Sequence, residues 1–337
     1  MRILVTGGAG FIGSHFVKRV LRAGEDVVVL DKLTYSGNPA NLPDGIELIH
    51  GDIAEAEDVA RAAAGCDAIV NFAAETHVDR SILSAREFGR TEFHGTQVLL
   101  EHVRGSNQRL VQVSTDEVYG DLEGGGSSRE TDQLRPSSPY SAAKAAGDLL
   151  VPAYVRTFGV DASITRGSNS YGPNQYPEKF IPLFVTNALD GEPLPLYGDG
   201  RQVRDWLYVE DHCAGIELVL RAGGAGEVYN VGGGDEHENI EVAGRLLELA
   251  GADPALLRRV EDRPGHDRRY SLDTAKLRAL GWRPETPFDE GLAATVDWYR
   301  TNRAWWEPIK SGSYREYYER QYAERLARST AAPSGSV

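Results

Sequence analysis

The feature that most restricts how this chain can fold is a glycine-rich turn close to the N-terminus. Residues 2–5 form a short β-rich apolar run, and Ser14 to Ala23 has the periodicity of a helix. Gly7, Gly10 and Gly13 lie between them, spaced three residues apart. Such glycines allow a tight turn, let the backbone approach a pyrophosphate and point a helix N-terminus at its charge. Alone, the motif is also compatible with an ordinary tight turn, but its place between a strand and a helix predicts a dinucleotide-binding unit.

Apolar runs and helical patterns alternate along the rest of the first half. Runs typical of strands occur at residues 27–31, 46–50, 68–72, 109–114 and 162–166. A long helical pattern covers residues 81–103, and another begins at Pro139, which Ser138 can cap. Because parallel strands need helical crossovers, this alternation predicts an α/β fold with a Rossmann-type, doubly wound parallel sheet.

The second half of the chain has many Pro and Gly residues between short elements. At 337 residues the chain exceeds one ordinary core. We predict a nucleotide-binding domain over residues 1–170 and a smaller, mixed C-terminal substrate domain over residues 171–310. Segments near 209–235 and 288–303 are expected to return to the first domain. Residues 311–337 are expected to form a tail with an exposed helix and a disordered end.

Charge and composition narrow the possible partners and surroundings. Lys and Arg total 36 and Asp and Glu total 50, a net charge of −14, which disfavours nucleic acid and anionic membranes as partners. Cys66 and Cys213 lie far apart and the histidines form no metal-ligand pattern, so no metal is predicted. Without an apolar run of about 18 residues or room for a signal peptide before the first strand, we expect a cytoplasmic protein.

An acidic residue follows the glycine turn at the distance that a dinucleotide site requires. Asp31 ends the second predicted strand, about 20 residues after the turn, where a carboxylate can accept hydrogen bonds from an adenosine ribose. A carboxylate there repels a 2′-phosphate, so NAD is favoured over NADP; the other interpretation of Asp31 is a plain turn residue. Asp52 and Ile53 are expected beside the adenine, and residues 72–74 behind the nicotinamide half.

A tyrosine and a lysine lie four residues apart on the helix that Pro139 begins. Tyr140 and Lys144 therefore share one face of that helix. A phenol with a reference pKa of about 10 is a weak base at neutral pH, but a nearby cation favours the phenolate. Tyr140 is thus a candidate base for a sugar hydroxyl whose carbon loses hydride. Such pairs also occur by chance on solvated helix faces, so the interpretation depends on the surrounding motifs.

Two acids directly follow the fifth predicted strand. Neighbouring side chains of a strand point to opposite faces, so Asp116 and Glu117 share a pocket only if the strand ends before them. Open parallel sheets bind ligands at the carboxyl ends of their strands, which makes this stretch the expected chemical centre. One acid can remove a carbon-bound proton while the other protonates a departing hydroxyl. The alternative is a hydrogen-bonded loop pair, in which Thr115 caps the turn.

Four segments carry a resemblance to a known family. They are residues 74–81, 114–120, 177–182 and 262–270, which read AETHVDRS, STDEVYG, PEKFIP and DRPGHDRRY. With the glycine turn and the Tyr140/Lys144 pair, the chain resembles the extended short-chain dehydrogenase/reductase family and, within it, the dTDP-glucose 4,6-dehydratases. The resemblance covers nearly all of residues 1–310.

This resemblance implies a hydro-lyase of deoxysugar biosynthesis that converts dTDP-glucose to dTDP-4-keto-6-deoxyglucose and water. Tyr140, with Thr115 and Lys144, would deprotonate the 4-hydroxyl as hydride leaves C4 for NAD. Glu117 would then remove the C5 proton while Asp116 protonates the departing 6-hydroxyl, and the hydride would return to C6.

The resemblance also implies a tightly bound NAD that each turnover regenerates, and a homodimer that pairs the helices near Ser81 and Pro139. Family members usually carry Asn where this chain has Glu92 and Ser170. Glu92 adds a charge near the cofactor segment, and Ser170 is expected to weaken a contact on the nicotinamide side. Neither position belongs to the catalytic set.

The residues assigned to the two ligands follow from the motifs and the resemblance. The cofactor set is Gly7, Gly10, Phe11, Ile12, Gly13, Asp31, Lys32, Leu33, Thr34, Asp52, Ile53, Phe72, Ala73, Ala74, Thr91, Tyr140, Lys144 and Ser170. The substrate set is Thr76, Asn169, Lys179, Phe180, Pro195, Leu196, Tyr197, Arg204, Asn239, Arg263, His266 and Arg269. A nucleotide diphosphate brings negative charge to a protein at −14, so the substrate domain must concentrate cations, with Arg204 as the first choice.

Two other functions fit parts of the pattern. A related NAD-dependent UDP-sugar epimerase or decarboxylase would share Gly7, Asp31, Tyr140 and Lys144, but has no use for adjacent acids at the strand end. A catalytically silent NAD-binding sensor would need neither the acid pair nor the Tyr/Lys pair. The presence of both pairs favours the dehydratase.

Overall fold

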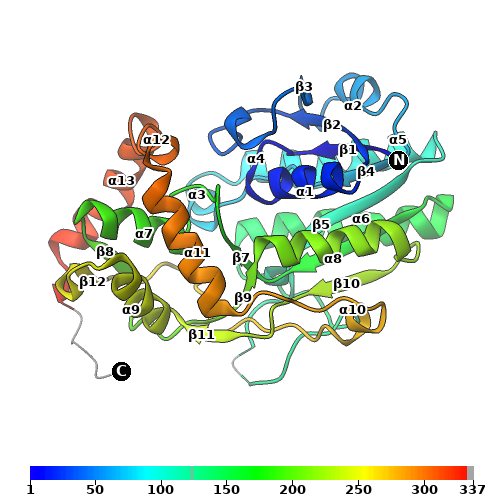
Figure 1. Ribbon diagram of the computed structural model, residues 1–337. Coiled ribbons are helices and arrows are strands. Elements are labelled where there is room, and N and C mark those ends of the chain that lie inside the picture. The colour runs from blue at the N-terminus through cyan, green and yellow to red at the C-terminus, as the bar shows by residue number, and fades with distance from the viewer. Residues whose placement is uncertain (123, 332–337) are drawn as a thin grey trace.

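A seven-stranded parallel sheet with helices on both faces forms the first domain of the computed structural model, which describes residues 1–122 and 124–331 (Figure 1). Its strands are β1 (Arg2–Thr6), β2 (Asp26–Asp31), β3 (Glu47–His50), β4 (Ala68–Asn71), β5 (Arg109–Thr115), β6 (Ala162–Gly167) and β10 (Val228–Val231). Their order across the sheet is β10-β6-β5-β4-β1-β2-β3. The order reverses between β1 and β4, the kind of switch point at which open α/β sheets bind ligands. The predicted Rossmann-type fold is confirmed.

Helices bury both faces of this sheet. One face is covered by α1 (Phe11–Arg22) and α8 (Val209–Ala222), and the other by α2 (Ala56–Ala62), α5 (Thr96–Arg104) and α6 (Pro139–Phe158). The alternation along β1 shows why: Ile3 and Val5 pack in the core with α1, while Leu4 packs in the core with α2 and α5. A sheet covered on both faces needs nearly continuous apolar strands, as the sequence has.

The helix predicted over residues 81–103 is wrong as a single element. This stretch contains α3 (Val78–Leu83), α4 (Arg86–Phe88), the π-helix η2 (Gly89–Gly95) and α5. Extended backbone at Ser84, with φ −158° and ψ 109°, separates α3 from α4. A π-helix adds one residue to a turn, and such insertions are rare and frequent at functional sites. Hydrophobic periodicity does not report so small a change.

The second domain contains two three-stranded sheets and a layer of helices. The first sheet has β7 (Asn169–Tyr171), β9 (Val203–Tyr208) and β11 (Glu236–Glu238), and the second has β8 (Leu194–Tyr197), β12 (Leu257–Val260) and β13 (Thr330–Ala331). The helices are α7 (Phe180–Asp190), α9 (Asn239–Ala250), α10 (Ala275–Ala279), α11 (Phe288–Thr301), α12 (Arg303–Trp306) and α13 (Ser313–Ala327). Within the described residues, none of the helices is both long and apolar enough to cross a bilayer.

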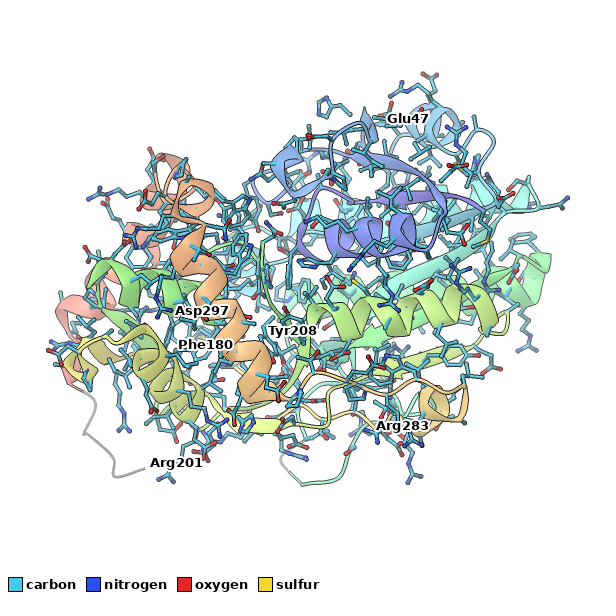
Figure 2. All side chains as sticks on the ribbon, viewed as in Figure 1. Glu47, Phe180, Arg201, Tyr208, Arg283 and Asp297 are labelled. Carbon is cyan, nitrogen blue, oxygen red and sulfur yellow. The ribbon has the colours of Figure 1, made fainter. Side chains whose placement is uncertain are left out.

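Only one of the two segments expected to return to the first domain does so. Helix α8 packs in the core with α1, and β10 pairs with β6. Helix α11 instead shares the core of the second domain with α7 and α9, where Phe288, Leu292 and Val296 are buried. Figure 2 shows Tyr208, at the end of β9, between Asp297 of α11 and the first domain. The apolar stripe of α11 predicted burial but could not indicate which core would bury it.

The exposed helix and disordered end predicted for residues 311–337 are wrong in part. Helix α13 forms, but Tyr314, Tyr317 and Tyr322 are each no more than 5% exposed. The end predicted to be disordered includes Thr330–Ala331, which pairs with β12 as strand β13. Residues 332–337 lie outside the described part of the chain. The tyrosines recur at helical spacing between charged residues, and this apolar stripe was the signal for a buried face.

Candidate active site

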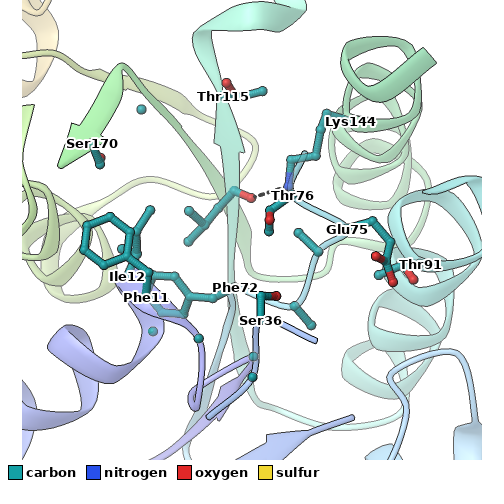
Figure 3. Close-up of a pocket in the computed structure, with 18 of the residues that line it drawn as sticks. Phe11, Ile12, Ser36, Phe72, Glu75, Thr76, Thr91, Thr115, Lys144 and Ser170 are labelled. Atoms are coloured by element: carbon teal, nitrogen blue, oxygen red, sulfur yellow. Dashed lines mark hydrogen bonds between the residues drawn. The ribbon is translucent and has the colours of Figure 1, made fainter. Parts of the chain in front are cut away.

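A cavity of about 270 Å³ opens at the carboxyl ends of the parallel strands, beside the switch point between β1 and β4. Its walls come from the glycine turn, the segments after β4 and β5, helix α6 and the first residues of the second domain. In Figure 3, Phe11 and Ile12 approach from α1, Glu75 and Thr76 from the segment after β4, and Lys144 from α6. The cavity therefore lies between the two domains.

The glycine turn has the geometry that a pyrophosphate site needs. Gly7 has a φ of +65°, and a Cβ there would lie 2.6 Å from the backbone nitrogen of Ala73. A Cβ on Gly13 would lie 2.4 Å from the carbonyl oxygen of Gly7. Both positions therefore exclude side chains and let α1 start close to β1. The N-cap of α1 is Gly10, without a capping side chain, so the first-turn N–H groups remain available to an anion.

Asp31 ends β2 and fixes the adjoining turn. Its carboxylate accepts hydrogen bonds from the backbone N–H groups of Ala9, at 2.9 Å, and Leu33, at 2.8 Å. Each carboxylate oxygen retains acceptor capacity for a ribose hydroxyl. Burial raises the pKa of Asp31, and the two backbone hydrogen bonds oppose the rise. Asp31 is therefore a turn residue in this structure and also borders the cavity, while the next side chain, Lys32, pairs with Asp52 at 3.0 Å.

The acid pair lies on one wall of the cavity because β5 ends at Thr115. The 3-10 helix η3 (Asp116–Tyr119) follows at once, and the Thr115 hydroxyl caps it by accepting the N–H of Glu117 at 3.3 Å. Both acids border the cavity, as the prediction required. Gly120 has a φ of +80°, and a Cβ there would lie 2.2 Å from the carbonyl oxygen of Arg135. This glycine allows the chain to leave η3 sharply.

The two acids have different electrostatic surroundings. Burial raises the pKa of Asp116 well above its usual range, and the carboxylate of Glu117 raises it further. Burial also raises the pKa of Glu117, but the cations Arg263, Lys179 and Arg204 oppose that rise. Burial and the neighbouring carboxylate thus favour the protonated form of Asp116, while nearby positive charge favours the carboxylate form of Glu117. This division suits one acid and one base.

Helix α6 presents the tyrosine and the lysine. It starts at Pro139 through a reciprocal cap between Ser138 and Ser141. The Nζ of Lys144 donates to the carbonyl oxygen of Val113 at 3.0 Å, a bond that Figure 3 draws. Desolvation raises the pKa of Tyr140 well above its usual range, so the phenol is neutral in the free protein.

Comparison with known proteins places the chain in a family. The model of the GDP-mannose 4,6 dehydratase family matches residues 4–295. A dTDP-glucose 4,6-dehydratase of Streptomyces niveus is 56% identical over 324 residues, which cover 92% of this chain and 96% of that protein. One of Neisseria meningitidis serogroup B is 48% identical and covers 93% of this chain and 97% of that protein. The chain belongs to the dTDP-glucose 4,6-dehydratase family.

Solved structures agree with this family. The dTDP-glucose 4,6-dehydratase of Streptomyces venezuelae, solved with NAD and dTDP bound, is 55% identical with a TM-score of 0.89 and covers 92% of this chain and 100% of that chain. A UDP-glucose 4-epimerase of Thermus thermophilus in complex with NAD is 36% identical with a TM-score of 0.85, covering 90% and 100%. The predicted resemblance is confirmed, and the epimerase alternative shares the fold.

Nearly all of the predicted cofactor set of this dehydratase family member borders the cavity. The exception is Leu33, whose φ is +51° and whose N–H serves the Asp31 turn. Six buried polar atoms on the walls have no hydrogen-bond partner within the described residues: Ser114 Oγ, Asp116 Oδ2, Ser168 Oγ, Asn169 Oδ1, Gln175 Oε1 and His212 Nε2. Buried polar atoms are costly to leave unpaired, so these walls suit polar ligands. The residues present fit NAD.

Only part of the predicted substrate set borders the cavity. Thr76, Asn169 and Lys179 border the cavity. The rest lie outside its walls: Phe180, Pro195, Leu196, Tyr197, Arg204, Asn239, Arg263, His266 and Arg269. Leu196 is 1% exposed in the core of the second domain, because alternate residues of β8 face inward, and this leaves no surface for a ligand.

Several predicted cations already have protein partners. Arg269 contacts Glu236 at 2.6 Å, and His266 Nδ1 lies 2.6 Å from Asp262 Oδ1. Arg204 donates to backbone carbonyls and lies 4.5 Å from the centre of the Tyr270 ring. Arg269 and His266 thus each contact a neighbouring carboxylate in this structure, and neither borders the cavity.

Some wall residues were missed from the sequence. They include Ser36, Gly37, Glu75, Gln175, Tyr176 and His212. His212 comes from α8, and its Nδ1 lies 2.7 Å from the Ser170 hydroxyl. The His212 ring fits only because residue 167, at the end of β6, is a glycine. A Cβ at that position would lie 2.4 Å from the ring. The contact joins segments distant in sequence, so no local pattern signals it.

Within the described residues, no group of three or more His, Cys, Asp or Glu side chains is placed to hold a metal ion.

A polar cluster closes the space between the two domains. The hydroxyl of Tyr35 donates to Glu178 at 2.7 Å, and Arg80 Nε donates to the other oxygen of Glu178 at 2.8 Å. The guanidinium of Arg80 lies 3.8 Å from the centre of the Tyr35 ring and 4.3 Å from that of Tyr317. Four segments meet here: the loop after β2, α3, the start of the second domain and α13. Arg80 and Glu178 thus join two of the four segments that carry the family resemblance.

The glycine geometry gives a first testable prediction. In Gly13→Ala, the new methyl group must displace Gly7 or the start of α1, so we expect the NAD content of the purified protein to fall by about tenfold or more. NAD released by denaturation is quantified, and circular dichroism checks the fold. The control is Gly244→Ala on α9, where a Cβ meets open space. Unchanged NAD content in Gly13→Ala would contradict the assignment of the turn.

Proposed function

We propose that this protein is a dTDP-glucose 4,6-dehydratase that converts dTDP-glucose to dTDP-4-keto-6-deoxyglucose and water with a recycled NAD. The observation that carries the proposal is the Asp116–Glu117 pair on one wall of a cavity that Tyr140 and Lys144 also line. Identity of 56% to a relative of that name, and the NAD and dTDP bound in the Streptomyces venezuelae structure, support it. Epimerase activity would account for the Tyr/Lys pair, but it would give the acid pair no role in the reaction.

The first step is oxidation at C4 of the hexose. The phenolate of Tyr140 accepts the proton of the 4-hydroxyl, and the Lys144 ammonium stabilises that phenolate. The Thr115 hydroxyl, at the same wall, orients the 4-hydroxyl. NAD⁺ supplies the hydride chemistry, taking hydride from C4 and returning it to C6 at the end of the cycle.

The second step is elimination of water across C5 and C6. The ketone at C4 acidifies the C5 proton, which Glu117 removes, and Asp116 gives its own proton to the 6-hydroxyl as it leaves. The cations around Glu117 favour its carboxylate form, and burial favours the protonated form of Asp116. Hydride then reaches C6 and a proton returns to C5. One water is released and the sugar undergoes no net redox change.

The proposed activity has a direct test. Purified protein is incubated with dTDP-glucose in deuterated water, and the nucleotide sugar is examined by mass spectrometry and NMR. We expect a 4-keto-6-deoxy product that carries solvent deuterium at C5. UDP-glucose and UDP-glucuronic acid are the comparison substrates. Conversion of a UDP-sugar without any conversion of dTDP-glucose would rule the proposal out.

Substitution of each acid separates their roles. In Glu117→Gln, we expect oxidation at C4 without loss of the C5 proton, so borodeuteride trapping labels C4 of an intact hexose and product formation falls by about 10²-fold or more. In Asp116→Asn, the base remains, so the C5 proton should exchange with solvent while water loss is slowed to a similar degree. If Glu117→Gln dehydrates at the wild-type rate, Glu117 is not the C5 base.

We also propose that the protein is a homodimer formed through the outer faces of α6 and the segment from α3 to η2. The support is a set of exposed apolar side chains there: Leu149 is 62% exposed, Phe93 43% and Ile82 42%. Exposed apolar side chains gathered on neighbouring helices are typical of association sites.

For the location of the protein we propose the cytoplasm. Both cysteines are free thiols, as is usual in a reducing compartment. Cell fractionation tests this proposal.

The dimer proposal predicts a change of mass in solution. Leu149→Glu places a charge in the proposed interface, so we expect the molecular mass measured by light scattering to halve at micromolar concentration. Leu249→Glu is the control, because Leu249 is 36% exposed on α9 of the second domain. Loss of the dimer in Leu249→Glu, or its persistence in Leu149→Glu, would place the interface elsewhere.

A further inference from the structure

The π-helix η2 brings a second carboxylate to helix α6. Glu92 is 1% exposed, whereas the adjoining Phe93 is 43% exposed, so η2 has one face inside and one outside. Its backbone lies close to α6 because of Gly147, where a Cβ would lie 2.6 Å from the carbonyl oxygen of Glu92. This approach places the Glu92 side chain beside Lys144, which the family resemblance did not predict.

Both carboxylate oxygens of Glu92 have partners. Oε2 lies 3.1 Å from Nζ of Lys144, and Oε1 accepts the backbone N–H of Glu75 at 3.1 Å. Lys144 Nζ also donates to the Val113 carbonyl at 3.0 Å. An ammonium group has three protons, so these two contacts fix it against β5 and η2 and leave one proton for the cavity. Among the described residues, Glu92 therefore contributes one of the two contacts that hold this cation.

We propose that Glu92 is a positioning residue for the oxidation step, which fixes the Lys144 ammonium and sets the pH above which Tyr140 acts as a base. The inference rests on the proposed function, because it assigns Glu92 to the Tyr140 step of that reaction. A buried carboxylate beside the ammonium offsets part of its charge at Tyr140. The phenolate therefore gains less from Lys144 than it would from an unpaired lysine.

The charges around the site agree with this role. Desolvation raises the pKa of Tyr140, and the carboxylates of Glu117 and Glu92 raise it further. Burial raises the pKa of Glu92 itself, and the Lys144 ammonium opposes that rise. The other charged groups that face this set are Asp116 in η3, Glu75 after β4, and Asp148 on α6, which pairs with Arg166 at 2.8 Å. Loss of the Glu92 charge should therefore lower the pKa of Tyr140.

The test measures the pH dependence of oxidation alone. In a Glu117→Gln background, which is expected to stop after C4 oxidation, the single-turnover rate of ketone formation is followed by trapping across a range of pH. The rate rises as Tyr140 ionises, so a lower pKa moves the acid limb to lower pH. For Glu92→Gln we expect a downward shift of about one pH unit or more, since a charge within about 12 Å contributes at least that much at an effective dielectric constant of about 20.

Two control variants separate charge from packing. Glu92→Asp keeps the charge on a shorter side chain, so the acid limb should stay in place while the rate falls. Glu87→Gln removes an exposed carboxylate of α4 on the same segment, so it should change neither the position of the acid limb nor the rate. An acid limb that stays in place or moves upward in Glu92→Gln overturns the proposal.

A second measurement needs no substrate. The chain has six lysines, so the side-chain ammonium of Lys144 can be followed by NMR of isotopically labelled lysine and assigned by its loss in Lys144→Met. In Glu92→Gln we expect its ammonium protons to exchange with solvent about tenfold faster or more, since one charged partner is lost. Equal exchange in the two proteins overturns the proposal. If wild-type protein converts no dTDP-glucose, the proposed function fails while this measurement still tests the pair.

Discussion

The structure depends on keeping ionisable groups away from water at the carboxyl ends of the parallel strands. Asp116 and Glu117 line one cavity, and Glu92 contacts Lys144 of the same cavity, in a protein whose net charge is −14. Burying an unpaired carboxylate is costly, so each group must either keep its proton or have a cation close by. Burial favours the protonated form of Asp116, whereas Glu117 and Glu92 have cations close by. The site therefore combines a carboxylic acid that can donate a proton with a carboxylate that can accept one.

The cations that serve Glu117 come from the second domain, so that domain does more than cover the substrate. Arg263 is held at 2.8 Å by Asp79, which comes from α3 of the first domain. The same carboxylate accepts hydrogen bonds from Tyr197, at 3.0 Å, and from Gln321 of α13, at 3.1 Å. Helix α13 thus helps to hold Asp79, which in turn holds Arg263 near Glu117. Together with the Tyr35–Glu178–Arg80 cluster, these contacts join the domains into one electrostatic unit.

Sequence reasoning succeeded where a local rule determines the structure. The glycine spacing, the strand runs, the Ser138 cap and the end of β5 before Asp116 each depend on a few neighbouring residues, and all of these elements are found. It failed where the deciding contact is distant in sequence. The periodicity of residues 81–103 cannot reveal a π-helix whose inward face is set by contact with Gly147, and the stripe of α11 cannot indicate its core. The tyrosines of α13 were overlooked because charged residues surround them.

The two departures from the family pattern are explained by the same physics. Glu92 has Lys144 as its partner, and Ser170 has His212, whose pKa burial lowers to about 4 so that the ring is neutral at physiological pH. In each case a neighbouring side chain within the fold, rather than solvent, satisfies the new polar group. Both positions adjoin the oxidation half of the site, whereas the acid pair that eliminates water lies on η3. Glu92 and Ser170 therefore change the surroundings of the oxidation half, while the end of β5 and the Thr115 cap fix where Asp116 and Glu117 lie.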